Sequence, residues 1–196
     1  YTELSATGKA ILLLQDGEVV ESLTGQGQVI LDVTPFYAES GGQVADTGTM
    51  TSKTATVEVL DVIKAPNGQH LHTVHVTGTL SLNDEVTSQV TVNARLALTK
   101  NHTATHLLHQ ALKDVIGEHA NQAGSLVSAE RLRFDFTNMQ GLTSEELQRI
   151  ETIVNEKICA SLRTPFRCGN LAHYSTLKVR YFLHIRSPVR VEFIQI

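Results

Sequence analysis

The chain has 196 residues, of which 41% are hydrophobic and 18% charged, so it is long enough for one large domain or two small ones. We expect neither a membrane span nor a signal peptide, because no long apolar run and no basic-then-apolar start occurs. The net charge of −4 argues against a general nucleic-acid binder. Two cysteines, Cys159 and Cys168, are too few for a disulfide framework, so we expect a cytoplasmic protein with reduced thiols.

The first half of the chain, residues 1–93, has the pattern of a small β-barrel or sandwich. Asp16-Gly17 separates two short apolar segments and predicts a tight hairpin. Further strands are expected at residues 28–33, 56–63, 70–76 and 86–92, separated by turn residues such as Pro66-Asn67-Gly68. We expect His70, His72 and His75, in one of these strands, to be surface polar residues.

From about residue 94 the periodicity changes to that of an α+β domain, with helices covering one side of a sheet. A helix is predicted over residues 101–116, with Asn101 as its N-cap and Gly117 as its end. Residues 131–136 alternate as a half-buried strand, and Thr143-x-x-Glu146 predicts a capping box that opens a second helix. Strands are expected at residues 179–185 and 189–196.

Charge is distributed unevenly along the chain. Residues 163–196 contain six basic side chains and one acidic side chain, so this tail carries about +5 and the rest about −9. Two interpretations stay open. The basic residues form a solvated strand face, or they form an edge that faces phosphate groups.

Three histidines, His102, His106 and His109, recur on one face of the first predicted helix. At about 100° per residue the apolar side chains of this helix fall on the other face, so the histidines are expected on a solvent-facing stripe. Imidazoles four residues apart can share one metal ion, and His-x3-His is therefore half of a possible Zn²⁺ site. No Glu follows the first His, which disfavours a metalloprotease.

Further ligands would be needed to complete a zinc site. Cys168 and His173 lie beyond the second helix and are candidates for a tetrahedral set with His102 and His106. Cys159 is a poorer candidate, because it follows the core residue Ile158 in the helix.

One loop has an unusual composition. Residues 34–48, T-P-F-Y-A-E-S-G-G-Q-V-A-D-T-G, combine three glycines with Phe36 and Tyr37, and Gly41-Gly42 permits positive φ and a close approach by another molecule. This segment, centred on Gly41-Gly42-Gln43, closely resembles the Gly-rich motif of alanyl-tRNA synthetases of the bacterial type and of free-standing alanyl-tRNA editing proteins.

Other motifs extend the resemblance in the same order. N-H-T-A-T-H-L-L-H (residues 101–109) resembles the first zinc half-site of the editing domain in this family. Residues 121–127 and 132–136 match the segments that follow there, and the capped helix continues the match to about residue 162. The resemblance implies a fragment of a longer synthetase, with a Gly-rich β-barrel at 1–93 and an α+β editing domain at 94–196.

The function implied by the resemblance is hydrolysis of mischarged tRNA. An alanine pocket cannot strongly reject serine, so a second site removes the wrong amino acid. The expected substrate is Ser-tRNA(Ala), with Gly-tRNA(Ala) as a further one, and the expected partner is the tRNA(Ala) acceptor end. His102 and His106 would bind zinc, whereas Thr105 and Gln122 would line the substrate pocket and Thr105 would sense the serine hydroxyl. Gly41-Gly42 would let the barrel pack near the cleft that takes the acceptor end, or would simply form a tight turn stapled by Phe36 and Tyr37.

The tail departs from the family pattern. The family ends its zinc site with Cys-x3-His, whereas Cys168 and His173 form a Cys-x4-His that follows the second helix too soon. The tail therefore forms a shortened zinc site, or the three helical histidines bind metal with water, or the site is incomplete and the chain inactive.

Other functions remain open alongside that of a synthetase editing domain. They are a free-standing editing protein, a non-catalytic tRNA-binding module and a structural zinc domain. The chain has no phosphate-binding Gly-Lys loop, so the charging of tRNA with ATP would need an aminoacylation domain elsewhere in the synthetase.

Overall fold

The structure, a computed structural model, describes residues 3–160, 184–186 and 190–194. The chain forms two compact units, Tyr1–Arg95 and Leu96–Ile196. The boundary expected from the sequence lies after residue 93, close to this division.

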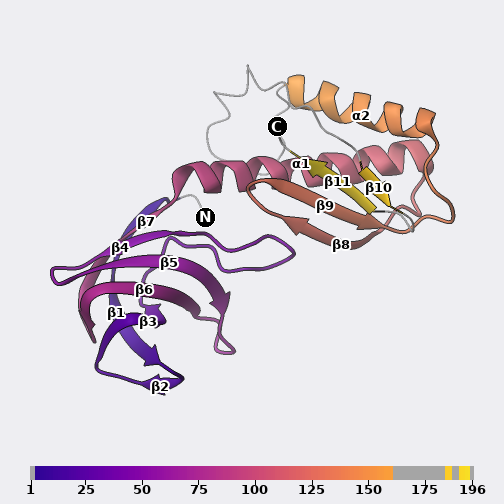
Figure 1. Cartoon of the computed structure of the whole chain (residues 1–196). Coiled ribbons are helices and arrows are strands. Elements are labelled where there is room, and N and C mark those ends of the chain that lie inside the picture. Colours follow the sequence, from indigo (N-terminus) through magenta and orange to yellow (C-terminus); the bar gives the residue numbers. More distant parts are fainter. Residues whose placement is uncertain (1–2, 161–183, 187–189, 195–196) are drawn as a thin grey trace. The chain divides into compact units, whose positions relative to one another are not determined.

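The first unit is a closed antiparallel β-barrel (Figure 1), which confirms the predicted fold class. Its strands are β1 (Ser5–Gln15), β2 (Glu18–Val19), β3 (Ser22–Leu31), β4 (Gly48–Thr51), β5 (Ala55–Lys64), β6 (His70–Ser81) and β7 (Glu85–Val90). The strand order is β2-β1-β3-β6-β5-β4-β7, and β1 also pairs with β7. This last pairing closes the ring, so every strand except the short β2 has a partner on both sides and the barrel presents no long free edge.

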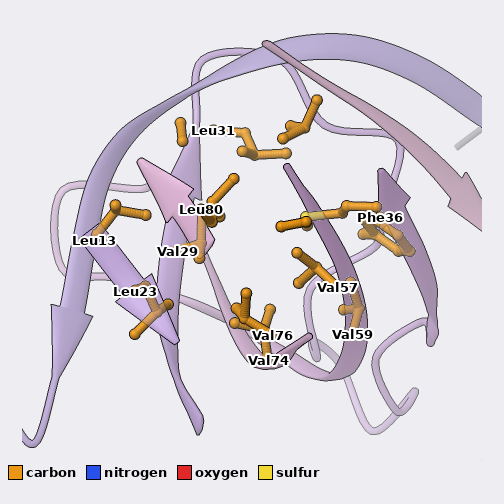
Figure 2. Close-up of a cluster of buried hydrophobic side chains, with 14 of the residues drawn as sticks. Leu13, Leu23, Val29, Leu31, Phe36, Val57, Val59, Val74, Val76 and Leu80 are labelled. Carbon is orange, nitrogen blue, oxygen red and sulfur yellow. The ribbon is translucent and has the colours of Figure 1, made fainter. Parts of the chain in front are cut away.

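Alternating residues of the strands fill the barrel. Val57 and Val59 of β5 and Val74 and Val76 of β6 point inward, and the residues between them are exposed or half-buried. Figure 2 shows these valines beside Phe36, which comes from the loop before β4 and is 1% exposed. The Gly-rich loop therefore contributes directly to the barrel core.

Predicted turns appear where positive φ is needed. Asp16 and Gly17 have φ of 52° and 85° between β1 and β2, which confirms the hairpin and fits a two-residue turn with the right twist. Gly68, in the turn between β5 and β6, has φ of 82°. A side chain at either glycine would be strained.

Helix α1 (Val92–Ile116) is longer than predicted. It begins directly after β7, so Asn101 lies well inside the helix and is not its N-cap. The C-terminal prediction is confirmed, because Gly117 has φ of 109° and its N–H bonds to the Lys113 carbonyl at 3.0 Å. The error at the N-terminus arose because the polar residues Lys100 and Asn101 interrupt the apolar pattern.

The second unit combines helices with a sheet of order β10-β11-β9-β8. Its further elements are β8 (Gln122–Val127), β9 (Arg131–Phe136), α2 (Ser144–Cys159), β10 (His184–Arg186) and β11 (Arg190–Ile194). The inward residues of β9 form one core with residues of both helices, so α1 and α2 cover the same face of the sheet, as predicted. The capping box of α2 is also confirmed, since Thr143 and Glu146 bond each other's backbone N–H.

Only part of the basic tail is described. Strand β11 pairs with β9 and β10 pairs with β11. Strand β11 lies within the segment expected at 189–196, and β10 overlaps the end of the segment expected at 179–185 and extends one residue beyond it. Cys168 and His173 lie outside the described residues, as do most of the basic side chains of residues 163–196.

Candidate functional site

His102 and His106 lie side by side on α1. Their ring centroids are 5.2 Å apart and their planes meet at 23°. His102 is half-buried and His106 is exposed. Burial, and secondarily the neighbouring His106, lower the pKa of His102 from 6.5. A neutral imidazole is the form that binds a metal, so the lowered pKa of His102 and the placement of the two rings both suit a half-site.

The described residues supply no complete metal site. No group of three His, Cys, Asp or Glu side chains that could hold a metal occurs among residues 3–160, 184–186 and 190–194. The predicted ligands Cys168 and His173 are outside these ranges. Zinc binding by His102 and His106 therefore stays a prediction. The described residues supply only these two of the ligands that a zinc site needs.

Thr105 sits between the two histidines in sequence and is 7% exposed. Its hydroxyl donates to the Asn101 carbonyl at 2.9 Å. Because a carbonyl cannot donate, the hydroxyl hydrogen is committed to this bond, and toward a ligand Thr105 offers only lone pairs. The side chain is thus set up as a hydrogen-bond acceptor.

Gln122, the other predicted pocket residue, opens strand β8 and is exposed. Its Nε2 donates to the Ser125 Oγ at 3.2 Å. The register between β8 and β9 shifts between Gln122 and Gly124, so a bulge sets the direction of this end of the strand.

His109 does not share the environment of His102 and His106. Its Nε2 donates to the Ala120 carbonyl at 3.1 Å, and its ring lies 5.2 Å from that of Phe134. The expectation of a solvent-facing stripe is therefore wrong for this residue. The chain reverses at Gly117 and returns beside the end of the helix, and the helical periodicity could not reveal that return.

The Gly-rich loop ends in a two-residue turn. Ser40 and Gln43 exchange backbone hydrogen bonds of 3.2 and 3.1 Å, and Gly41 and Gly42 between them have φ of 61° and 82°. A Cβ on Gly41 would meet no described atom within 4 Å, so positive φ rather than close packing in this unit requires glycine there. Tyr37 braces the turn by donating from its hydroxyl to the Ser40 carbonyl at 3.1 Å.

A buried ion pair holds the base of this loop, and sequence reasoning missed it. Arg95 Nε lies 2.8 and 3.0 Å from the Asp46 carboxylate oxygens, Arg95 Nη2 also bonds this carboxylate, and it donates to the Pro35 carbonyl at 2.9 Å. The Tyr37 N–H donates to Asp46 at 2.7 Å. No local pattern signals this pair, because its partners are far apart in the sequence.

His72 completes the support of the loop from β6. It is fully buried, its Nδ1 lies 2.9 Å from the Val29 carbonyl, and its Nε2 lies 2.8 Å from the Thr34 hydroxyl. The carbonyl requires Nδ1 to be the donor, so Nε2 accepts from Thr34. Burial, and to a smaller extent the neighbouring His70, lower the pKa of His72 from 6.5 to about 4, against the opposing effect of the Val29 carbonyl. The expectation of a surface residue is wrong, because strand β6 turns His72 inward.

Comparisons with known proteins agree with the motifs. Residues 1–94 match the family model of class II (A) tRNA synthetases. Over 175 residues, 88% of this chain, 57% of positions are identical to an alanine–tRNA ligase of Exiguobacterium sibiricum. Alanine–tRNA ligases of Geobacillus kaustophilus and Bacillus subtilis are 56% and 55% identical, each over 165 residues and 83% of this chain.

The matched segment is a limited part of these relatives, since the chain spans 20% of the Exiguobacterium protein and 19% of the other two. No helix in the described part of the chain is long and apolar enough to cross a membrane. Identity above one half, sustained through the barrel and into the second unit, leads to one conclusion: the chain belongs to the alanine–tRNA ligase family.

Proposed function

We propose that this chain is the editing portion of an alanine–tRNA ligase and hydrolyses the ester bond of mischarged Ser-tRNA(Ala), with Gly-tRNA(Ala) as a further substrate. The observation that carries the proposal is the group of residues on α1, where the imidazoles of His102 and His106 pair and Thr105, next to His106 in the sequence, is held as a hydrogen-bond acceptor. The full-length protein would attach alanine to tRNA(Ala) with ATP, and the tRNA acceptor end would be the partner of this part.

Thr105 gives this site a means of selecting serine. A serine hydroxyl has a hydrogen to donate, and the Thr105 oxygen has its own hydrogen committed to Asn101, so the pair is complementary. Alanine has no side-chain hydroxyl, so an alanyl ester would leave the nearly buried Thr105 oxygen without this hydrogen bond. Sites that hydrogen-bond a substrate hydroxyl discriminate strongly against an analogue that lacks it.

His102 and His106 would hold Zn²⁺ in this proposal, with Cys168 and His173 as predicted but structurally undescribed further ligands. When bound, the ion would supply Lewis-acid polarisation of the ester carbonyl or of a water molecule. The contribution of the chain itself is to favour the neutral form of His102 through burial and to orient the Thr105 hydroxyl through its bond to the Asn101 carbonyl. Gln122 would contact the aminoacyl group from β8.

The decisive experiment is single-turnover hydrolysis of Ser-tRNA(Ala) and Ala-tRNA(Ala) by the purified chain. The proposal predicts faster loss of the serine ester and survival of the alanine ester. Loss of neither ester, with retained tRNA binding, would instead identify a non-catalytic tRNA-binding module. Equal loss of both would show that the chain does not discriminate.

A further inference from the structure

Two side chains of α1 hold the two ends of strand β8. Asn101 is 5% exposed, and its Nδ2 donates to the carbonyls of Ser128 at 2.7 Å and Ala129 at 3.3 Å, just beyond the end of β8. His109 donates from Nε2 to the carbonyl of Ala120 at 3.1 Å, just before β8 begins. We refer to Asn101 and His109 as the β8 anchors.

The β8 anchors bond backbone carbonyls that lie outside helices and strands and so have no donor from regular secondary structure. The carbonyls of Ser128 and Ala129 belong to the turn between β8 and β9, and that of Ala120 belongs to the turn after α1. Buried backbone carbonyls need donors, and side chains supply them here. Asn is also a poor helix former, so its position inside α1 is explained by these tertiary bonds rather than by local preference.

The proposed site residues are divided between the same two elements. His102, Thr105 and His106 belong to α1, whereas Gln122 belongs to β8. Residues on one helix keep their spacing without help. The placement of Gln122 relative to this helix depends on what fixes β8 to α1, and the β8 anchors are hydrogen bonds that do so at both ends of the strand, with His109 at the end that carries Gln122.

We propose that Asn101 and His109 are positioning residues that fix strand β8, and with it Gln122, to the helix that carries His102 and Thr105. The proposal rests on the proposed editing function. The β8 anchors touch no reacting atom. They act on hydrolysis only through the placement of β8, and misplacement of a substrate-contacting group by about 1 Å can slow a reaction about 100-fold.

The first test measures the anchoring without a substrate, by amide hydrogen exchange along β8. Asn101→Ala should speed exchange about 10-fold or more toward Val127, and His109→Phe should do so toward Gln122. Phe at position 109 keeps a ring against Phe134, and His109→Gln, which retains an N–H donor, should restore protection. Gln110→Ala is the control, because Gln110 is exposed and bonds Asp114 on the same helix. Unchanged exchange in both anchor variants would overturn the anchoring.

The second test is a double-mutant cycle on Ser-tRNA(Ala) hydrolysis, under conditions where circular dichroism shows each variant folded. His109→Phe should lower the single-turnover rate about 10-fold or more in the wild-type background, but less than about 2-fold in Gln122→Ala, because His109 anchors the end of β8 that carries Gln122. Equal losses in both backgrounds would show that His109 does not act through Gln122. If His109→Phe does not fold, Asn101→Ser and Asn101→Ala enter the same cycle.

The two tests separate this inference from the proposed function. A wild-type chain that hydrolyses neither ester refutes the proposed function and the positioning role together, whereas the exchange result still decides whether the β8 anchors exist. An active wild type with additive mutational effects refutes only the positioning role.

Discussion

Acidification should destabilise the barrel through His72. The pKa of this buried imidazole is lowered from 6.5 to about 4, chiefly by burial. The unfolded chain therefore binds a proton at a higher pH than the folded chain does. The contribution of His72 to the free energy of unfolding is fully present above pH 6.5 and is lost as the pH falls from 6.5 to about 4. Below about pH 4 the loss is complete. At about 1.4 kcal/mol per pKa unit, the loss amounts to about 3 kcal/mol.

Denaturant unfolding at pH values from 7.5 to 4 would measure the effect, with His72→Gln as the matched variant. Gln can donate to the Val29 carbonyl and accept from Thr34 but does not titrate in this range. The free energy of unfolding of the wild type should fall about 3 kcal/mol more than that of the variant. Other groups that titrate, including His102 with its lowered pKa, are common to both proteins and cancel in the difference.

Proton NMR of the imidazole provides a direct check, because the ring resonances of His72 should titrate near pH 4 in the folded chain. A His72 resonance that titrates near 6.5, or equal pH slopes for the wild type and His72→Gln, would refute the reasoning. Either result would mean that water reaches this side chain despite its burial.

Four further changes test other parts of the structure. Arg95→Met should lower the free energy of unfolding by about 3–5 kcal/mol in denaturant titrations, because it leaves the Asp46 carboxylate buried without its cation. A loss below about 1 kcal/mol would contradict the burial of the pair. Ser88→Ala should stabilise the barrel by about 1 kcal/mol, since the buried Ser88 hydroxyl has no hydrogen-bond partner among the described residues, and exposed Thr87→Ala is the control. Thr105→Val should reduce the ratio of serine-ester to alanine-ester hydrolysis rates about 10-fold, which corresponds to about 1.4 kcal/mol for a lost hydrogen-bond acceptor. Equal effects of the substitution on both esters would exclude a role of Thr105 in selectivity. His106→Ala should abolish zinc binding measured by metal analysis after dialysis, and unchanged stoichiometry would refute its assignment as a ligand.

Local patterns predicted much of the fold. Asp16-Gly17, the Thr143–Glu146 capping box and the alternation of residues 131–136 each depend on neighbours in the sequence, and each is present in the structure. The pairing of β1 with β7 that closes the barrel has no such local signal, because it joins segments from opposite ends of the first unit.

The candidate site was predictable only where its residues share one element. The spacing of His102 and His106 on a helix is enough to bring their rings together. His109 has the same periodicity, yet a returning segment of chain covers it, and helical periodicity carries no information about that segment. His72 was misjudged for a related reason. The alternation of β6 places it on the inward face with Val74 and Val76, but its partners Val29 and Thr34, which satisfy a buried imidazole, lie outside that strand.

The side chains that sequence reasoning missed or misplaced have a common chemical task. His72, Arg95, Asn101 and His109 each donate to a backbone carbonyl that is distant in the sequence, those of Val29, Pro35, Ser128 and Ala120 respectively. Three of these carbonyls lie in loops or turns, where no strand ladder supplies a donor. A buried polar group must find a partner, so a polar side chain that the fold covers bonds the backbone of the segment packed against it. The sequence identifies the donor, whereas the identity of the carbonyl depends on the tertiary fold.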